Sequence, residues 1–366
     1  MEPVNAWVVE AGDVCWLRAD VALAAAARRE AGQLARGICL PAETVGRMEL
    51  CVTEMATNLL KHAHDGSLAL RVARGGGRVA VECLSLDNGP GIQDLAGAMR
   101  DGTSGTGTLG IGLGAIGRLA DAFGVHSLPG RGTVVFARFW TDTPSLSPIP
   151  EPAAAVLAPP PAPAAGLGGV VSGGLTRPIS GEQVCGDTWA IRAVGDEGRN
   201  GSLMMMCDGL GHGPLAARVA DRAREAFRES RHTSPVAVLE DVHRHLRGTR
   251  GAAAAIALVD VARGRVELAG AGNITAAVVT DDTRVGLLSM PGIVGAHMPR
   301  PRMFETPWPP GAVLVLHSDG LSDRWKPADF PGLFGQDPAM IAGQLLNQMA
   351  VRRDDAGIAV AVHRGP

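Results

Sequence analysis

Acidic residues stand next to glycine at the ends of several apolar runs in the C-terminal half of the sequence. The acids that flank these runs are Asp187, Asp208, Asp319 and the adjacent pair Asp354 and Asp355. Any one of them is most simply a turn residue beside a strand, but four such positions are more than turns require. Carboxylate oxygens and a backbone carbonyl suit Mg²⁺ or Mn²⁺ rather than zinc. Two such ions close together could activate a water molecule and clamp a phosphate for in-line hydrolysis.

A second group of polar residues that could bind a ligand lies on one face of a helix expected over residues 41–62. Glu54 and Asn58 are four residues apart and Lys61 follows three residues later, so the three side chains share a face. A carboxylate and an amide placed in this way can position a nucleophile and a hydrated Mg²⁺. Taken alone, the motif favours a solvated polar stripe on an amphipathic helix.

An aspartate with nearby glycines follows an expected strand at residues 78–86. Asp87 begins the sequence Asp-Asn-Gly-Pro-Gly, which contains Gly89 and Gly91. An aspartate at a strand end can accept a hydrogen bond from the amino group of adenine, and the glycines let the backbone approach a ligand. Asn-Gly and Pro-Gly are also strong turn signals, so the motif by itself indicates a turn.

A glycine-rich segment runs into an expected helix that starts near residue 113. Its glycines are Gly105, Gly107, Gly110, Gly112 and Gly114. Glycines followed by a helix N-terminus form a cradle for phosphate. A Rossmann dinucleotide site would place such a motif straight after the first strand, with an acid about 20 residues further on. The late position of this segment argues against that interpretation.

Strands and helices mixed along the sequence predict an α/β or α+β chain, and the helices are recognised by apolar residues at helical spacing. In the N-terminal part, we expect strands at 6–10, 67–73, 78–86 and 132–140, and helices at 18–37, 41–62 and 113–122. In the C-terminal part, we expect strands beside each of the acids above and a helix at 214–228. The methionine run at 204–206 is interpreted as a buried strand.

A proline-rich tract divides the chain. Eight of the 25 prolines fall within residues 144–163, and proline fixes φ and removes a backbone donor, so this tract cannot form a regular helix or a central strand. We therefore expect a semi-extended linker at 143–168 between a domain at 1–142 and a second domain at 169–366.

Composition excludes several classes of protein. The net charge of −3 argues against a general nucleic-acid binder, and no apolar run approaches the roughly 18–20 residues that span a bilayer. The first residues, Met1-Glu2-Pro3, lack the basic and apolar regions of a signal peptide. The six cysteines have no C-x-x-C spacing and indicate free thiols. We therefore expect a cytoplasmic protein that binds neither nucleic acid nor a membrane.

In their order along the chain, the three N-terminal motifs resemble the N box and the two glycine boxes of the GHKL (Bergerat-fold) ATPases. The segments 53–63 and 104–121 are most similar to the small anti-sigma-factor serine kinases of the RsbT/RsbW/SpoIIAB group. The resemblance covers about residues 6–140 and implies a Bergerat-fold α/β sandwich. It also implies an ATP site in which Asn58 binds Mg²⁺, Asp87 reads adenine, and Glu54 orients or deprotonates the attacking hydroxyl. The other implied ATP contacts are Lys61, Gly89, Gly91 and the lid glycines Gly105, Gly107, Gly110, Gly112 and Gly114.

The C-terminal acids resemble those of the SpoIIE/RsbU/RsbX branch of the metal-dependent PPM-type serine/threonine phosphatases, over about residues 170–363. The resemblance implies an α-β-β-α sandwich that binds two Mg²⁺ or Mn²⁺ ions. The implied ligands, catalytic through these metals, are Asp187, Asp208, the Gly209 carbonyl, Asp319 and Asp354, with Asp355 as the alternative to Asp354. Two departures leave the substrate range open. Thr188 and Trp189 follow the first Gly-Asp, and the last motif reads Asp-Asp-Ala-Gly where Asp-Asp-Ile-Thr is common.

A kinase-like domain and a phosphatase-like domain on one chain imply a bifunctional regulator of a bacterial partner-switching system. The C-terminal domain would remove phosphate from serine or threonine on a STAS-domain anti-anti-sigma factor or a stressosome-type scaffold protein. The N-terminal domain would bind ATP and Mg²⁺ and phosphorylate or bind a related partner, such as another STAS protein, a sigma factor or another phosphatase. The alternative is a phosphatase whose N-terminal domain is a non-catalytic module that senses a nucleotide or a partner. The sequence indicates no particular oligomeric state.

Overall fold

The computed structural model describes residues 8–75, 78–99, 112–141, 169–194, 201–351 and 353–364 of the chain. The chain forms two compact units. The N-terminal unit is Gly12–Ala164, and the C-terminal unit is Met1–Ala11 together with Ala165–Pro366. The linker expected at 143–168 lies outside the described residues. No helix in the described ranges is long and apolar enough to cross a bilayer.

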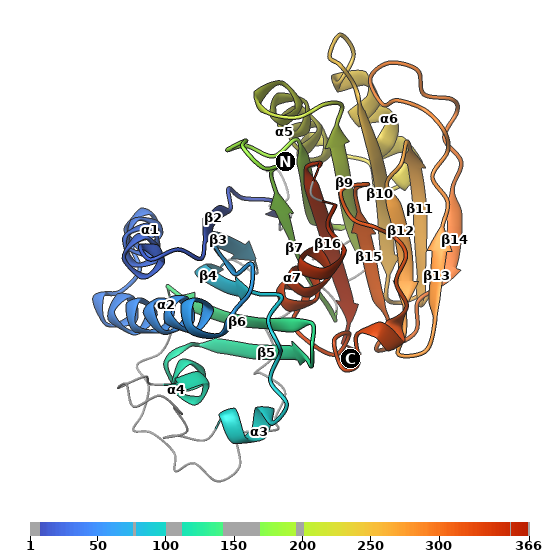
Figure 1. Ribbon diagram of the computed structural model, residues 1–366. Helices are drawn as coiled ribbons and strands as arrows, with labels where there is room; N and C mark the ends of the chain where they lie inside the picture. Colours follow the sequence, from blue (N-terminus) through green and yellow to red (C-terminus); the bar gives the residue numbers. More distant parts are fainter. Residues whose placement is uncertain are drawn as a thin grey trace. The chain divides into compact units, whose positions relative to one another are not determined.

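The N-terminal unit is an antiparallel five-stranded sheet with helices packed on one face (Figure 1). The sheet order is β2-β3-β4-β6-β5. The strands are β2 (Cys15–Arg18), β3 (Ser67–Gly75), β4 (Arg78–Leu86), β5 (Ala122–Leu128) and β6 (Gly132–Trp140). The helices are α1 (Leu23–Gly37), α2 (Ala42–His62), α3 (Leu95–Ala98) and α4 (Gly112–Leu119). The unit is therefore the α/β sandwich that the sequence predicts.

Helix α2 shows why this sequence positions its polar residues as it does. Met48, Val52, Met55 and Leu59 recur every three or four residues and are buried in the core between the helices and the sheet. The 41–62 helix expected from this spacing is confirmed within one residue. Glu54, Asn58 and Lys61 are left off the buried face, where they can meet a ligand.

A buried ion network holds the register of the sheet. The two carboxylate oxygens of Glu82 on β4 accept hydrogen bonds from Arg71 on β3 (2.7 Å) and Arg138 on β6 (2.8 Å). Burial alone would raise the pKa of Glu82, but the two guanidinium groups outweigh it and lower the pKa to about 2. Since β4 ends directly before Asp87, this network fixes where that aspartate emerges from the sheet.

The C-terminal unit consists of two antiparallel sheets between layers of helix. One sheet has the order β1-β8-β9-β10-β11-β14 and the other β13-β12-β15-β16-β7. The strands are β1 (Val8–Glu10), β7 (Val170–Arg177), β8 (Asp187–Val194), β9 (Gly201–Gly209), β10 (Ala252–Asp260), β11 (Arg265–Ala271), β12 (Thr275–Val279), β13 (Arg284–Leu287), β14 (Phe304–Pro307), β15 (Val313–His317) and β16 (Ala356–His363). The helices are α5 (Pro214–Glu229), α6 (Pro235–His245), the 3₁₀ turn η2 (Pro327–Asp329) and α7 (Pro338–Met349).

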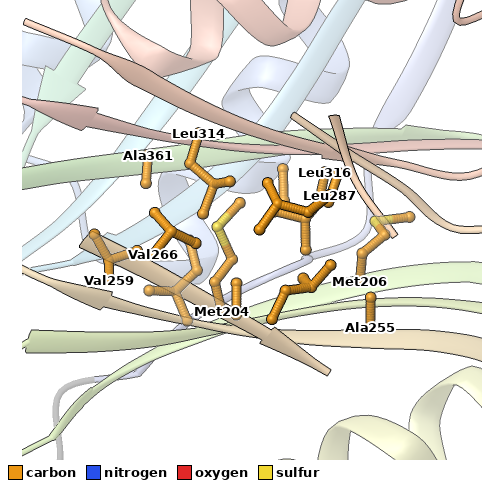
Figure 2. Close-up of a cluster of buried hydrophobic side chains, with 14 of the residues drawn as sticks. Met204, Met206, Ala255, Val259, Val266, Leu287, Leu314, Leu316 and Ala361 are labelled. Atoms are coloured by element: carbon orange, nitrogen blue, oxygen red, sulfur yellow. The ribbon is translucent and has the colours of Figure 1, made fainter. Parts of the chain in front are cut away.

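The two sheets enclose an apolar core to which both contribute alternate residues. Met204 and Met206 point into it from the six-stranded sheet, and Leu314 and Leu316 from the five-stranded sheet (Figure 2). Met205 points to the opposite face, where α5 and α6 pack, and α7 packs against β7 and β16. The layers are therefore helix, sheet, sheet, helix, as the sequence predicts. The interpretation of 204–206 as a buried strand is confirmed, since all three methionines are fully buried.

Several elements differ from the sequence expectations. Strand β2 occupies 15–18, and the first helix begins only at Leu23, after a turn in which Asp20 Oδ1 accepts a hydrogen bond from the Ala22 N–H (2.8 Å). Strand β5 begins at Ala122, where a helix was expected to end, because it pairs along its whole length with β6. Helices α6 and α7 were not expected. Their apolar faces are recognised only once the sheets they cover are present.

The first strand joins the C-terminal unit. Strand β1 lies within the 6–10 segment expected as a strand, but it pairs antiparallel with β8 at Arg192, Ile191 and Ala190. This placement differs from the expectation of one domain over 1–142. A short apolar segment can add to any free sheet edge, and its local sequence does not reveal which edge that is.

Candidate active sites

Four aspartates gather at one end of the two sheets in the C-terminal unit. Asp187 opens β8 and is paired in register with Asp208 on β9. Asp319 follows β15, and Asp354 precedes β16, the strand that pairs with β15. In antiparallel neighbours, the end of one strand and the start of the next share an edge. The four carboxyl groups expected as metal ligands are therefore brought together by the topology.

The negative charge of each carboxylate opposes the ionisation of its neighbours. Burial, followed by the charges of Asp319 and Asp354, raises the pKa of Asp208 to about 7. Burial and the charge of Asp208 raise the pKa of Asp187 well above its usual range, and burial and Asp354 raise that of Asp319. A site that holds this much carboxylate is stable in its ionised form only beside cations.

The donor set fits a pair of hydrated Mg²⁺ or Mn²⁺ ions. Asp187 Oδ1 is buried and accepts no hydrogen bond from the described residues, so it is an oxygen without a partner. No three acidic, His or Cys side chains of the described ranges already surround a single point. Mg²⁺ does not need such a cage, because it keeps several waters and takes one or two carboxylates. Gly209, expected to offer its carbonyl, lies beside Asp208 at the end of β9.

Asp354 and Asp355 have different surroundings. Both Asp355 oxygens accept backbone hydrogen bonds, from Ile179 N–H (2.7 Å) and Gly186 N–H (2.8 Å), and the side chain is buried. Asp355 thus anchors the loop that leads to Asp187. Asp354 is exposed and adds its charge to Asp208 and Asp319. The surroundings favour Asp354 as the ligand and Asp355 as its structural neighbour.

Two polar residues contact the cluster that the sequence motifs did not single out. Asn273, between β11 and β12, donates from Nδ2 to Asp319 Oδ2 (2.6 Å). Ser318 donates from Oγ to Asp187 Oδ2 (2.6 Å). Ser318 stands directly before an Asp-Gly pair, a position that could have been examined for a hydroxyl. Asn273 gives no such signal, since its contact joins residues 46 positions apart.

Two of the N-terminal motifs meet at the start of α4. Glu54 Oε1 on α2 accepts a hydrogen bond from the Gly112 N–H (3.2 Å), where Gly112 begins α4 with φ of +72°. Asn58 is half-buried and Lys61 exposed on the same helix. Gly114 is buried within α4. The expected lid glycines Gly105, Gly107 and Gly110 lie outside the described residues.

Asp87 lies in a turn that depends on glycine. Its Oδ1 accepts a hydrogen bond from the Gly89 N–H (2.7 Å), and burial raises its pKa. At Gly91, where φ is +70°, a Cβ atom would collide with the Leu128 carbonyl, and at Gly132 it would collide with the Asp87 carbonyl. The backbone here can therefore approach only because side chains are missing, as a pocket closed by glycines requires.

Comparison with known proteins identifies the family. Residues 17–139 match the family model described as "Histidine kinase-like ATPase domain". Residues 198–356 match that described as "Stage II sporulation protein E (SpoIIE)". The serine/threonine-protein kinase RsbT of Bacillus subtilis (strain 168) is 31% identical over 115 residues, which are 31% of this chain and 86% of RsbT. The chain belongs to the RsbT family and carries a SpoIIE-type phosphatase domain.

Solved structures with a similar fold overlap about half of the chain. A chain in "The bacterial stressosome: a modular system that has been adapted to control secondary messenger signaling" is 30% identical with a TM-score of 0.48, covering 52% of this chain and 98% of that chain. RsbX in complex with magnesium is 18% identical with a TM-score of 0.45, covering 52% and 94%. The RsbU and RsbW domains of a Mycobacterium tuberculosis protein are 20% identical with a TM-score of 0.43, covering 55% and 61%.

The RsbT-like chain thus joins two kinds of domain. Its C-terminal unit is a metal-dependent protein serine/threonine phosphatase of the SpoIIE type. Its N-terminal unit is a kinase-like ATPase domain. Each unit carries its own set of motif residues, all of which are described except the three lid glycines.

Without divalent cations, the C-terminal unit should lose stability as the pH rises. The pKa of Asp208 is about 7 in the folded chain against an ordinary value of 3.8, so the folded state holds an extra proton between these values. This stabilisation is complete below the ordinary value and is lost as the pH rises through about 7. Mn²⁺ or Mg²⁺ should oppose the loss by binding the ionised form, adding about 2.7 kcal/mol at 100 times its Kd. Thermal unfolding with and without Mn²⁺, between about pH 5 and about pH 8, measures both effects.

Two variants complete this measurement. Asp208→Asn should flatten the pH dependence and weaken the response to Mn²⁺, because it removes a charge that burial and the neighbouring Asp319 and Asp354 oppose. Asp282→Asn, an exposed aspartate in the turn between β12 and β13, should behave as the wild type. A wild-type chain whose cation-free stability rises with pH over this range would contradict the charge opposition described here.

Proposed function

We propose that this chain is a bifunctional partner-switching regulator whose C-terminal unit dephosphorylates serine or threonine on a STAS-domain protein. The observation that carries the proposal is the convergence of four carboxyl groups from both sheets, with the pKa of Asp208 at about 7. Such a cluster is costly to build unless cations occupy it. The SpoIIE-type match supplies the reaction class, and the resemblance to anti-sigma-factor kinases supplies the class of partner.

The residues around the cluster have separable roles in this reaction. Asp187, Asp208, Asp319 and Asp354, with the Gly209 carbonyl, would hold the metals. When bound, Mg²⁺ or Mn²⁺ supplies an acidified water and neutralises the charge of a phosphate. Asn273 fixes one oxygen of Asp319, and Asp355 fixes the loop before Asp187 through its two backbone hydrogen bonds.

For the N-terminal unit we propose binding of ATP and Mg²⁺ through Asn58, Lys61, Asp87 and the glycines around them. Glu54 would accept the proton of a serine or threonine hydroxyl on a second STAS-type or scaffold partner. Its contact with the Gly112 N–H supports this role, because it ties the carboxylate to the element that follows the glycine-rich segment.

We propose the domains at 1–142 and 169–366, apart from the β1 strand, as the functional units, and the cytoplasm as their location. All six cysteines are free in the structure, which is consistent with a reducing compartment.

Phosphate removal and phosphate transfer can be measured on the same partner. Full-length protein with Mn²⁺ should release phosphate from a phosphoserine STAS-domain protein. Asp208→Asn should lower the rate by more than about 100-fold, since even residues behind the ligands cost about 10–100-fold. Asp282→Asn is the matched control and should retain the rate.

With ATP and Mg²⁺, the same chain should transfer phosphate to the unphosphorylated STAS protein, and Asn58→Ala should abolish the transfer. ATP binding without transfer would support the sensing module instead. Equal phosphatase rates for the wild type and Asp208→Asn would overturn the assignment of the phosphatase site.

Substitutions of the adjacent Asp354 and Asp355 should have different effects, one on Mn²⁺ binding and the other on the free energy of unfolding. Asp354→Asn should weaken Mn²⁺ binding while leaving cation-free unfolding nearly unchanged, because its side chain is exposed. Asp355→Asn should lower stability by about 1–3 kcal/mol, because an amide leaves one of two backbone N–H groups without an acceptor. Isothermal titration with Mn²⁺ and denaturant unfolding measure the two effects. The reverse pattern would make Asp355 the ligand.

A further inference from the structure

A buried serine joins the two sheets at the phosphatase site. Ser318 is fully buried at the end of β15 in the five-stranded sheet. Its Oγ donates to Asp187 Oδ2 (2.6 Å) at the start of β8 in the six-stranded sheet. Its neighbour in sequence is Asp319. One short segment therefore carries one ligand of the cluster and holds another that belongs to the opposite sheet.

The direction of this hydrogen bond follows from the other contacts of the hydroxyl. The Gly357 N–H on β16 donates to Ser318 Oγ (3.0 Å), and the Ser318 N–H donates to the Gly357 carbonyl (3.0 Å). A hydroxyl has one hydrogen. Of the two acceptors near Oγ, Asp187 Oδ2 at 2.6 Å is much closer than the Gly357 carbonyl at 3.5 Å, so the hydrogen is donated to Asp187. Oδ2 of Asp187 is thus engaged, and Oδ1 is the oxygen left without a partner.

The close approach of the strands requires glycine at position 357. A Cβ atom there would lie 2.9 Å from the Cβ of Asp187 and would collide with the end of Met206. This is one of the two positions, with Ala356, at which the chain departs from the Asp-Asp-Ile-Thr pattern. The missing side chain lets β16 lie close enough to β8 for the hydroxyl of Ser318 to span the gap.

We propose that Ser318 is a positioning residue for the phosphatase: it holds Asp187 Oδ2 so that Oδ1 faces a bound cation. This inference rests on the proposed function of the cluster. It predicts that removing the hydroxyl weakens cation binding more than it weakens the fold, because the chain atoms of Ser318 keep their backbone bonds to Gly357.

The test is Mn²⁺ binding by the full chain, measured by titration calorimetry without substrate. Ser318→Ala should weaken Mn²⁺ binding about 10–100-fold, the range for residues that orient metal ligands. Ser318→Cys fills nearly the same space with a much weaker donor and should also bind more weakly, with unfolding close to the wild type. Ser322→Ala, in the loop that follows, is the matched control and should bind as the wild type.

A double-mutant cycle distinguishes positioning from a merely structural role. If Ser318 acts through Asp187, Ser318→Ala should have little further effect on binding in an Asp187→Asn background. Additive losses, or wild-type affinity in both Ser318 variants, would overturn the inference while leaving the proposed function intact. A wild-type chain that binds no Mn²⁺ would overturn both.

A separate set of contacts concerns residues 8–11, which precede the N-terminal unit in sequence but belong to the C-terminal unit. Beyond the β1–β8 ladder, the Ala11 N–H donates to the Trp189 carbonyl (2.8 Å), and Ala11 is buried in the core between the sheets. Gly12, the next residue, begins the N-terminal unit. The ATPase-type domain is thus inserted directly behind a strand of the phosphatase.

Two arginines of helix α5 also donate hydrogen bonds to this segment. Arg228 Nη2 donates to both carboxylate oxygens of Glu10 (3.0 and 2.9 Å), and Arg224 Nη1 donates to the Ala11 carbonyl (2.6 Å). Strand β8 begins with Asp187, and α5 follows β9, the strand that carries Asp208 near its end. Residues 8–11 are therefore attached to β8, which carries Asp187, and to α5, the helix that follows β9 in sequence.

We infer that residues 8–11 form a strap through which nucleotide binding in the N-terminal unit reaches β8 and α5. This inference rests on the proposed binding of ATP. A movement of Gly12 would shift residues 8–11. That shift would change their backbone hydrogen bonds to β8 and their contacts with the arginines of α5.

Insertion of a flexible Gly-Ser linker of about nine residues between Ala11 and Gly12 tests the strap. Strand β1 can still pair with β8, but movements of Gly12 no longer displace it. In the wild type, the non-hydrolysable analogue AMP-PNP with Mg²⁺ should change amide exchange in residues 187–194 and 214–229 by about fivefold or more, the lower range of allosteric coupling. The insertion should abolish this change, and the same insertion within 144–163 should not.

The affinity for AMP-PNP, measured in parallel, separates the two ideas. Unchanged exchange in a wild-type chain that binds the analogue, or a response that survives the insertion at Gly12, would overturn the strap alone. A chain that binds no analogue would overturn the proposed nucleotide site and the strap with it.

Discussion

The repulsion among four carboxyl groups is the constraint on which the architecture of the C-terminal unit depends. Asp187, Asp208, Asp319 and Asp354 come from strands of both sheets, and the pKa values of the first three are raised. Nothing local favours bringing them together. The apolar core between the sheets does so, because it aligns the strand ends while each buried Leu or Met contributes about 1.5–3 kcal/mol. The packing of the core therefore holds together a group of carboxyl groups that repel one another.

The contacts around the cluster follow from the same constraint. Two of the four carboxylates that would face a cation have one oxygen held by a neutral side-chain donor, Ser318 for Asp187 and Asn273 for Asp319. Asp355, adjacent in sequence to a ligand, instead satisfies two backbone N–H groups. Acidic residues with the same chemistry thus serve different purposes according to the donors that the fold places beside them.

The sequence predicted the parts of both sites whose signal is local. Periodic apolar residues gave the bounds of α2, and acids next to glycine marked the strand ends at Asp208 and Asp319. The unexpected parts depend on contacts distant in sequence. The partner edge of β1, the pairing of β5 with β6, and the roles of Ser318 and Asn273 follow from how strands meet, which no single segment encodes.

The number of Mn²⁺ ions bound per chain in the absence of nucleotide tests the central claim most directly. It is obtained by titration monitored by electron paramagnetic resonance of the free ion. We expect two ions per wild-type chain and a loss of high-affinity binding in Asp208→Asn, with Asp282→Asn unchanged. Binding of no ion, or binding that Asp208→Asn leaves intact, would contradict the assignment of the carboxylate cluster as the metal centre of a phosphatase.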